Sequence, residues 1–157
     1  MTAVGLLLWA VAVLLVQFYL SGEEKKRVEE CEGLVLLLRH VRASVSAYAL
    51  PKDKIYRAFS HKALERCGFL SALREEGLAR ALETGGLSLG EETLRPLVIF
   101  AAGEGMRLTE EELSACALAL ETAESSLTEL KRRLPERLRL CRTLVLTGGM
   151  MVAVLLL

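Results

Sequence analysis

The residues that could carry chemistry are few and stand far apart in the sequence. No two of the four cysteines form a C-x-x-C pair, so neither a zinc site nor a redox disulfide is predicted. Cys31 and Cys116 fall on apolar helical stripes, where a free cysteine behaves as a small hydrophobic residue. We therefore expect the cysteines to serve packing and not catalysis.

The other candidates for chemistry are equally sparse. His40 and His61 are the two histidines, and neither has a metal partner at helical spacing. The glycine-rich stretch 103–108 lacks the G-x-x-x-x-G-K-[ST] pattern of a phosphate loop. The acidic run 110–112 is typical of a helix N-terminus, where the helix dipole favours carboxylates. Because no serine or cysteine has a credible base, the sequence predicts a protein that is not an enzyme and uses no cofactor or metal.

The distribution of charge divides the chain into three parts. The 20 basic and 20 acidic side chains all lie between Glu23 and Arg142, and both ends of the chain are uncharged. The middle has the composition of an ordinary water-soluble segment. We therefore predict an N-terminal transmembrane anchor over 1–22, a cytoplasmic all-α domain over 23–142 and a C-terminal transmembrane segment over 143–157.

The N-terminal apolar stretch has the length of a membrane span. As a helix, residues 3–20 would measure about 27 Å, close to the roughly 30 Å of a bilayer's hydrocarbon core. Gln17 is the one strongly polar side chain within the stretch. A cleaved signal peptide is the alternative, but it requires a basic start and small residues before the cleavage site. Residues 1–5 carry no basic side chain, so an uncleaved anchor is favoured.

The C-terminal apolar stretch is shorter. Residues 143–157 would form about 22 Å of helix. The run lacks the polar stripe of a surface helix, and Gly148 and Gly149 allow the close approach common between membrane helices. A lipid-anchor signal does not fit, because the residues just upstream are rich in arginine. A buried core helix at the end of a soluble fold is the alternative, and a second membrane span is favoured.

Basic side chains flank both apolar stretches on the side of the charged middle. By the positive-inside rule this asymmetry places the middle in the cytoplasm and points both termini across the membrane. We predict that these residues anchor the chain at the surface of the lipid bilayer. They are Lys25, Lys26, Arg27, Arg132, Arg133, Arg137, Arg139 and Arg142.

The charged middle has helical periodicity. Apolar residues at steps of three and four form one seam over 28–45 and another over 113–134. The simplest arrangement is two long antiparallel helices that continue into the two spans, with a kink or restart at Pro135. Ser88 and Glu91 form a possible capping box. The fold class is an all-α, membrane-anchored helical bundle. Three shorter helices are expected between the long ones, over 52–67, 71–84 and 90–103.

The order of these segments resembles that of a known family. The quoted segments are "ALPKDKIYRAF" (49–59), "LVIFAAGEGMRLTEEE" (97–112) and the closing "LCRTLVLTGGMMVAVLLL" (140–157). Together with the N-terminal apolar stretch, they resemble the stage III sporulation protein AB family of endospore-forming bacteria over nearly the full chain.

The resemblance implies a function and a location. It implies a non-enzymatic part of the secretion-type, channel-like complex that joins mother cell and forespore. The cytoplasmic domain would be similar to that of the F-type inner-membrane platform protein of type II secretion. The implied partners are the AA-type ATPase of the complex and its other membrane components, with no nucleic acid and with homo-oligomers left open. The implied location is the mother-cell side of the membrane around the forespore.

Candidate partner-binding residues lie in the part of the middle farthest from the predicted membrane. Acidic and basic side chains alternate over 52–108, although for any single residue a solvated surface is the simpler interpretation. The alternative function is a self-associating, membrane-anchored coiled coil with a structural role, in which the seams would pair between chains. The candidates are Lys52, Asp53, Arg57, Arg74, Glu75, Arg80, Glu91 and Glu92.

Overall fold

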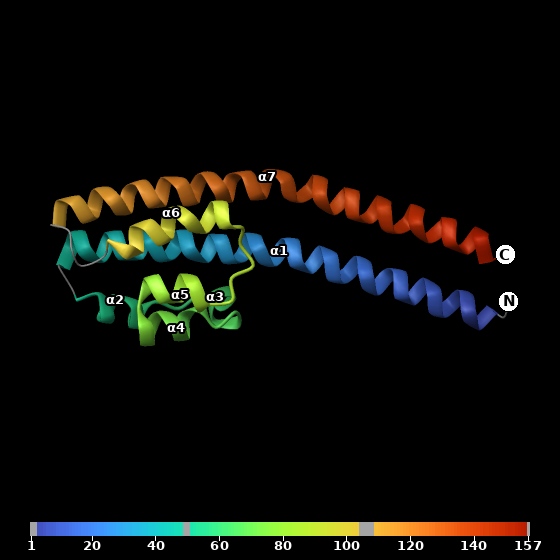
Figure 1. The fold of residues 1–157 in the computed structure, drawn as a ribbon, viewed down its shortest axis with the longest axis horizontal. Coiled ribbons are helices and arrows are strands. Elements are labelled where there is room, and N and C mark those ends of the chain that lie inside the picture. Colours follow the sequence, from blue (N-terminus) through green and yellow to red (C-terminus); the bar gives the residue numbers. More distant parts are fainter. Residues whose placement is uncertain (1–2, 49–50, 104–108, 157) are drawn as a thin grey trace.

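The described part of the chain is built of helices alone, which confirms the all-α prediction (Figure 1). The structure is a computed structural model that describes residues 3–48, 51–103 and 109–156. The helices are α1 (Ala3–Tyr48), α2 (Lys52–Ala58), α3 (Lys62–Arg66), α4 (Phe69–Glu76), α5 (Leu78–Thr84), α6 (Glu91–Ala102) and α7 (Thr109–Leu156).

Two long helices organise the molecule. α1 and α7 pack side by side as an antiparallel hairpin, so the N- and C-terminal ends of the chain lie at the same end of the molecule (Figure 1). α2 and α3 pack on α1, α4 joins them to α5, and α6 packs against both α5 and α7. The short helices all lie beside the half of the hairpin that is remote from the termini, and we call this half the bundle (Figure 1).

The two predicted seams form the centre of the bundle. Within α1 the seam residues Cys31 and Leu38 are buried, and within α7 Cys116 and Ala123 are buried. The Cys31 thiol donates to the carbonyl of Ala123 at 3.9 Å, and the Cys116 thiol donates to that of Leu38 at 3.7 Å. Such contacts need small side chains, because only they let two helix backbones approach this closely. The cysteines therefore set the spacing of α1 and α7.

The short helices complete the core. Their apolar faces cover the side of α1 that α7 leaves open, and the side chains there are almost fully buried. Burial of a large apolar side chain contributes about 1.5–3 kcal/mol. The largest fully buried side chains on the short helices are those of Ile55, Leu64, Phe69, Leu70 and Leu73.

Ion pairs cross the outside of the hairpin at regular intervals. Each has at least one exposed partner and therefore adds only about 0–1 kcal/mol to stability. Together they fix the register of the two helices, because a shift of one helix along the other would break all three pairs at once. The pairs are Glu24 with Arg137 at 3.0 Å, Glu32 with Lys131 at 3.2 Å and Arg39 with Glu124 at 2.6 Å.

The short helices differ from the prediction in number. The expected helix over 52–67 is divided into α2 and α3, because Phe59 and His61 have extended backbones. The expected helix over 71–84 is divided into α4 and α5 at Gly77, whose φ of 85° and ψ of 176° favour glycine.

The start of α6 also corrects the sequence analysis. Gly90 is the N-cap, and no side chain caps the helix. The predicted capping box of Ser88 with Glu91 is therefore wrong. The Ser88 backbone N–H instead donates to Oε2 of Glu30 at 2.6 Å, which fastens the segment before α6 to α1.

The predicted transmembrane spans at the two ends are wrong. Over the part of the chain that the structure describes, no helix combines the length and the apolar character needed to cross a membrane. Charged residues begin at Glu23 on α1 and continue to Arg142 on α7, so each apolar stretch is bounded by charge on the side of the bundle.

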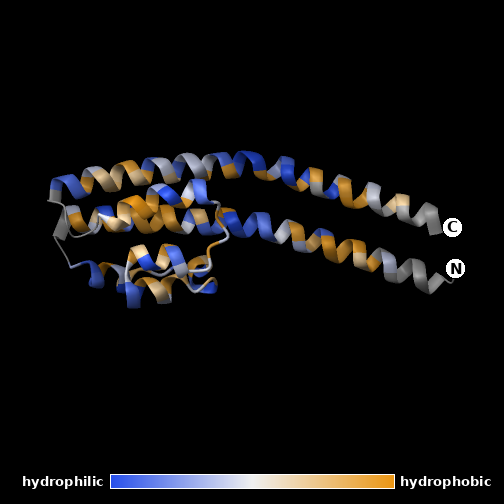
Figure 2. Cartoon of the chain, in the orientation of Figure 1, coloured by the Kyte–Doolittle hydropathy of each residue, from blue (hydrophilic) through white to orange (hydrophobic). Residues whose placement is uncertain are grey.

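The ends of the hairpin are continuous with the bundle. α1 passes through Gly22 and α7 passes through Pro135 without a break, so no helix restarts at the proline. Beyond the bundle, apolar side chains are exposed on both helices. Figure 2 shows apolar residues along these parts of α1 and α7. We call these two segments, residues 11–20 and 140–151, the arms. Their exposed large apolar residues are Val11, Leu14, Leu15, Val16, Phe18, Tyr19 and Leu20 on α1, and Leu140, Leu144, Leu146, Met150 and Met151 on α7.

Candidate functional site

An apolar groove lies between α6 and α7. It has a volume of about 280 Å³, and two of its residues, Ile99 and Leu118, are 62% and 67% exposed. Outside the arms, Leu36 is the one further large apolar side chain in the described chain that is exposed. The groove therefore gathers most of the apolar surface that the bundle leaves open. Its lining residues are Pro96, Ile99, Phe100, Ala115, Leu118, Ala119 and Thr122.

The sequence of α7 explains why a groove forms here. Ala115 and Ala119 are one turn apart, so they share a face of the helix and leave space above it. Phe100 of α6 is buried below this space. Pro96 stands inside α6 and cannot donate a backbone hydrogen bond to the preceding turn. Small side chains on one helix and large ones on the other thus produce a hollow with an apolar floor.

The rim of the groove is mainly acidic. Glu111 and Glu121 are exposed on α7 within a turn of groove residues. On α6, Glu92 and Arg95 are exposed within a turn of Pro96 and Ile99 respectively. Three carboxylates against one guanidinium favour a partner with basic side chains beside an apolar face.

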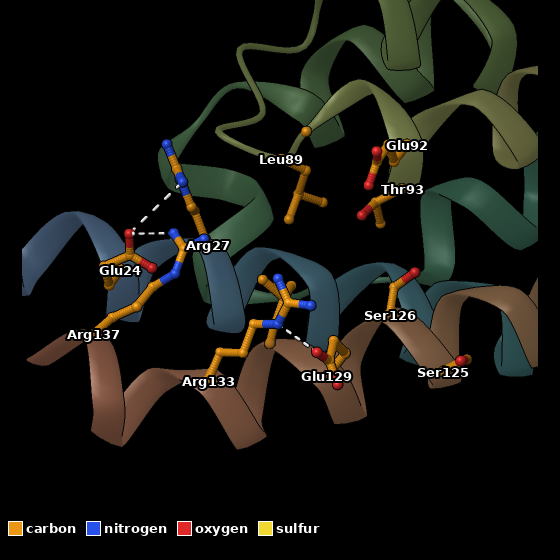
Figure 3. Close-up of a pocket in the computed structure, with 12 residues that line it drawn as sticks. Glu24, Arg27, Leu89, Glu92, Thr93, Ser125, Ser126, Glu129, Arg133 and Arg137 are labelled. Atoms are coloured by element: carbon orange, nitrogen blue, oxygen red, sulfur yellow. Dashed lines mark hydrogen bonds and ion pairs between the residues drawn. The ribbon is translucent and has the colours of Figure 1, made fainter.

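A second, charged cleft lies where the start of α6 meets α1 and α7 (Figure 3). Its volume is about 430 Å³. At one end Glu24 accepts a hydrogen bond from Arg137 at 3.0 Å and lies 3.8 Å from Arg27. The lining residues are Glu24, Arg27, Leu89, Gly90, Glu92, Thr93, Ser125, Ser126, Glu129, Leu130, Arg133 and Arg137.

Glu129 forms the second charged cluster of this cleft. Arg132 donates to both of its oxygens at 2.9 Å, and Arg133 donates to it through Nε. These hydrogen bonds stabilise the ionised carboxylate and lower the pKa of Glu129 to about 2. Each carboxylate, Glu24 and Glu129, is therefore shared by two arginines.

The predicted membrane anchors have different surroundings in the structure. Arg27 and Arg137 share Glu24, and Arg132 and Arg133 share Glu129, so four of the eight are engaged in ion pairs at the cleft. Lys26 lies 3.7 Å from Glu30, and Lys25, Arg139 and Arg142 are exposed. Their role as anchors stays a prediction.

The predicted partner-binding residues do not form one cluster. They are spread over α2, α4, α5 and α6, and three of them have partners within the chain. Lys52 pairs with Glu112, Arg74 donates to the carbonyl of Phe59 at 3.0 Å, and Arg80 lies 3.5 Å from Glu83. The others are exposed and form no ion pair with another described residue. They are Asp53, Arg57, Glu75, Glu91 and Glu92.

The sequence analysis did not identify Glu30. Its side chain is fully buried, where it accepts the hydrogen bond from Ser88 and lies 3.7 Å from Lys26. Its position in the sequence could have identified it. Glu30 stands one turn before Leu34 and next to Cys31, which places a charge at the edge of an apolar seam. Its role is to hold the loop before α6, and so to fix the position of both the groove and the cleft.

The described residues offer two binding surfaces, the groove and the cleft. In the described residues no three His, Cys, Asp or Glu side chains are grouped as metal ligands. Burial raises the pKa of the Cys31 thiol to about 11, so it is a poor nucleophile. His40 packs its ring 5.6 Å from that of Phe59. The groove and the cleft are therefore the features that bear on function.

Comparison with known proteins gives no relative for this chain. No protein-family model, no curated protein and no solved structure matches it.

Proposed function

We propose that the chain is a non-enzymatic adaptor of a secretion-type membrane complex and that it binds the ATPase of that complex. The resemblance of the sequence to the stage III sporulation protein AB family suggests the complex, which is the channel-like assembly between mother cell and forespore. The observation that carries the proposal is the groove between α6 and α7, where Ile99 and Leu118 are exposed on an otherwise well-packed bundle.

The occupant that fits the groove is an amphipathic helix of the ATPase. A helix that lays an apolar face into such a groove inserts side chains one turn apart, and a few of them supply most of the binding energy. The acidic rim, with Glu111 and Glu121, favours basic residues beside that apolar face. The groove lies in the half of the molecule remote from the termini, where a large partner has room (Figure 1).

The exposed charges of α2, α4 and α5 have a secondary role in this proposal. Asp53, Arg57 and Glu75 lie on helices that do not line the groove. Exposed charges at the edge of an interface mainly change the rate of association and its salt dependence. We expect them to orient the ATPase during its approach.

We also propose that the adaptor works at the mother-cell membrane around the forespore, with the bundle in the cytoplasm. The membrane components of the complex hold it there. The exposed apolar arms stand next to the exposed basic residues Lys25, Arg139 and Arg142. This combination favours contact with an anionic lipid surface. Cell fractionation tests the location, and recovery of the chain away from membranes in cells that hold the whole complex would refute it.

The direct test of the adaptor function is binding of the purified chain to the ATPase. We expect Leu118→Glu to weaken binding at least about tenfold, because it places a charge in the groove and loses a hot-spot contact. Leu36→Glu is the matched control, since Leu36 is exposed on α1 away from the groove. Full binding by Leu118→Glu, or no binding by the folded wild type, would contradict the proposal.

Self-association through the seams is the weaker alternative. The seam of α1 already packs against the seam of α7 within one chain, as the contact of Cys31 with Ala123 shows. Pairing between chains would require the hairpin to open. Sedimentation distinguishes the two functions, since a chain that is monomeric at micromolar concentration cannot work as a coiled-coil spacer.

A further inference from the structure

We propose that the charged cleft at the start of α6 binds a phosphate group. The inference is independent of the adaptor function, because the cleft and the groove share no lining residue. The cleft holds about 430 Å³ between α1, the start of α6 and α7.

The charge of the cleft favours an anion. Glu24 is shared by Arg27 and Arg137, and Glu129 is shared by Arg132 and Arg133. On the side formed by α1 and α7, Arg27, Arg133 and Arg137 face two carboxylates, so this side carries one excess positive charge. Glu92 on α6, across the cleft, makes the lining neutral as a whole. An anion is therefore favoured beside the arginines of α1 and α7 and not beside α6.

Arg133 is the residue placed to bind the ligand. Its Nε donates to Glu129, which fixes the plane of the guanidinium. The two terminal nitrogens point into the cleft and have no hydrogen-bond partner among the described residues (Figure 3). A guanidinium held in this way presents two parallel donors, which is the geometry that binds a phosphate in a bidentate manner.

Arg27 contributes a second guanidinium to the lining of the cleft. Its Nε atom is buried, so a ligand can reach only its terminal nitrogens, one of which lies 3.8 Å from Glu24. Arg27 therefore adds positive charge near the ligand, and Arg133 supplies the two parallel donors.

Neutral donors line the cleft as well. Ser125 and Ser126 stand on α7, the helix that carries Arg133, and Thr93 stands on α6 across the cleft (Figure 3). Gly90 also lines it, and as the N-cap of α6 it leaves the first backbone N–H groups of the helix without a side-chain cap. Such N–H groups add a favourable field for an anion that the arginines already bind.

Glu92 limits the affinity and supplies a test. Its carboxylate faces the same cleft as Arg133 and repels an anion there. Removal of its charge must therefore strengthen phosphate binding, whereas a merely structural cleft would not respond in this way. The volume of the cleft exceeds that of a bare phosphate, so the ligand can be a phosphate ester. A free phosphate compound and a lipid head group share this chemistry.

Calorimetric titration of the full chain with inorganic phosphate tests the site. We expect saturable binding that Arg133→Gln weakens about tenfold, that Arg133→Lys retains in part and that Glu92→Gln strengthens. Arg80→Gln is the control, because Arg80 is exposed on α5 and pairs with Glu83. It should bind as the wild type does. Circular dichroism establishes that each variant is folded.

Vesicles of phosphatidylglycerol identify the source of the phosphate. Loss of vesicle binding in Arg133→Gln, with competition by inorganic phosphate, indicates a lipid head group. Phosphate binding together with unchanged vesicle binding in Arg133→Gln indicates a free phosphate compound. The proposal is overturned if the wild type shows no saturable phosphate binding, if Arg133→Gln binds as tightly as the wild type, or if Glu92→Gln binds more weakly.

Discussion

The bundle and the arms belong to the same two helices, yet their apolar side chains have opposite surroundings. In the bundle, α1 buries Cys31, Leu34 and Leu38 against α7 and the short helices. In the arms, Phe18 is 82% exposed and Leu144 is 69% exposed. Figure 2 shows the same apolar colouring along both regions. Apolar composition alone therefore does not create a core.

The difference teaches what the short helices contribute. An α-helix covers only one face of its neighbour, so a two-helix hairpin leaves most of its surface open. α2–α6 close the remaining faces over the bundle and do not extend along the arms (Figure 1). We expect stability to reside in the bundle, and substitutions of matched type in the two regions test this.

The largest effect is expected from truncation of a core leucine. Leu64→Ala removes a fully buried side chain and should destabilise the fold by about 2–5 kcal/mol. Leu144→Ala in the arm should change stability by less than about 0.5 kcal/mol. Urea denaturation of both variants measures the two values. Equal losses would mean that the arms pack as tightly as the bundle, and the comparison would fail.

A smaller effect is expected where two helices approach closely. A Cβ at Gly33 of α1 would lie 2.6 Å from Nδ1 of His61 and 2.8 Å from Cγ of Leu64. Gly33→Ala should therefore cost about 1–3 kcal/mol through overpacking. At Gly148 in the arm a Cβ meets nothing within 4 Å, so Gly148→Ala should stabilise α7 by up to about 1 kcal/mol. Thermal denaturation gives the two signs, and a stabilising Gly33→Ala would show that α3 is not packed on α1.

The buried carboxylate predicts a loss of similar or lesser size. Glu30→Ala leaves the Ser88 N–H without its acceptor, at a cost of about 1–3 kcal/mol. Glu30→Gln keeps an acceptor oxygen and should cost less. Glu136→Ala, on an exposed part of α7, should stay within about 0.5 kcal/mol. Amide hydrogen exchange should show faster exchange around Ser88 in Glu30→Ala, and unchanged exchange there would exclude the proposed fastening of the loop.

The smallest effect concerns pH, at the boundary between the bundle and the arms. Because Arg132 and Arg133 lower the pKa of Glu129 to about 2, the carboxylate and its ion pairs persist below the ordinary pKa of 4.5. The stabilisation they give is complete above the ordinary pKa of 4.5 and disappears as the pH falls toward about 2. Carbon NMR of the carboxyl group measures the titration. Replacement of both arginines by glutamine should return the pKa toward its ordinary value, and no change would show that other groups cause the shift.

The parts of the fold that depend on local pattern could be predicted from the sequence. Steps of three and four identified the seams, and Val28, Val35, Leu120 and the cysteines of both seams are buried as that pattern requires. The divisions at Phe59–His61 and at Gly77 could not be predicted, because they depend on backbone angles that the packing of α2–α5 selects. The membrane spans were predicted from composition, and that prediction is wrong, because no described helix is both long and apolar enough to cross a membrane.

The candidate site was less predictable, because it depends on contacts distant in sequence. Arg133 and Arg137 were interpreted as membrane anchors from their position near an apolar end. In the structure Arg137 pairs with Glu24 of α1, from the opposite end of the chain. The groove requires α6 to lie on the alanines of α7, and helical periodicity does not specify which helix covers which face. These features arise from tertiary structure alone.

The position of both termini at one end of the hairpin has a mechanical consequence (Figure 1). A pulling force applied to the two ends would peel α1 from α7, and the load would fall on one pair of contacts at a time. The Glu24–Arg137 contact would rupture first, followed by Glu32–Lys131 and then Arg39–Glu124. The molecule should therefore open like a zipper under low tension, whereas the same contacts loaded in shear would resist together.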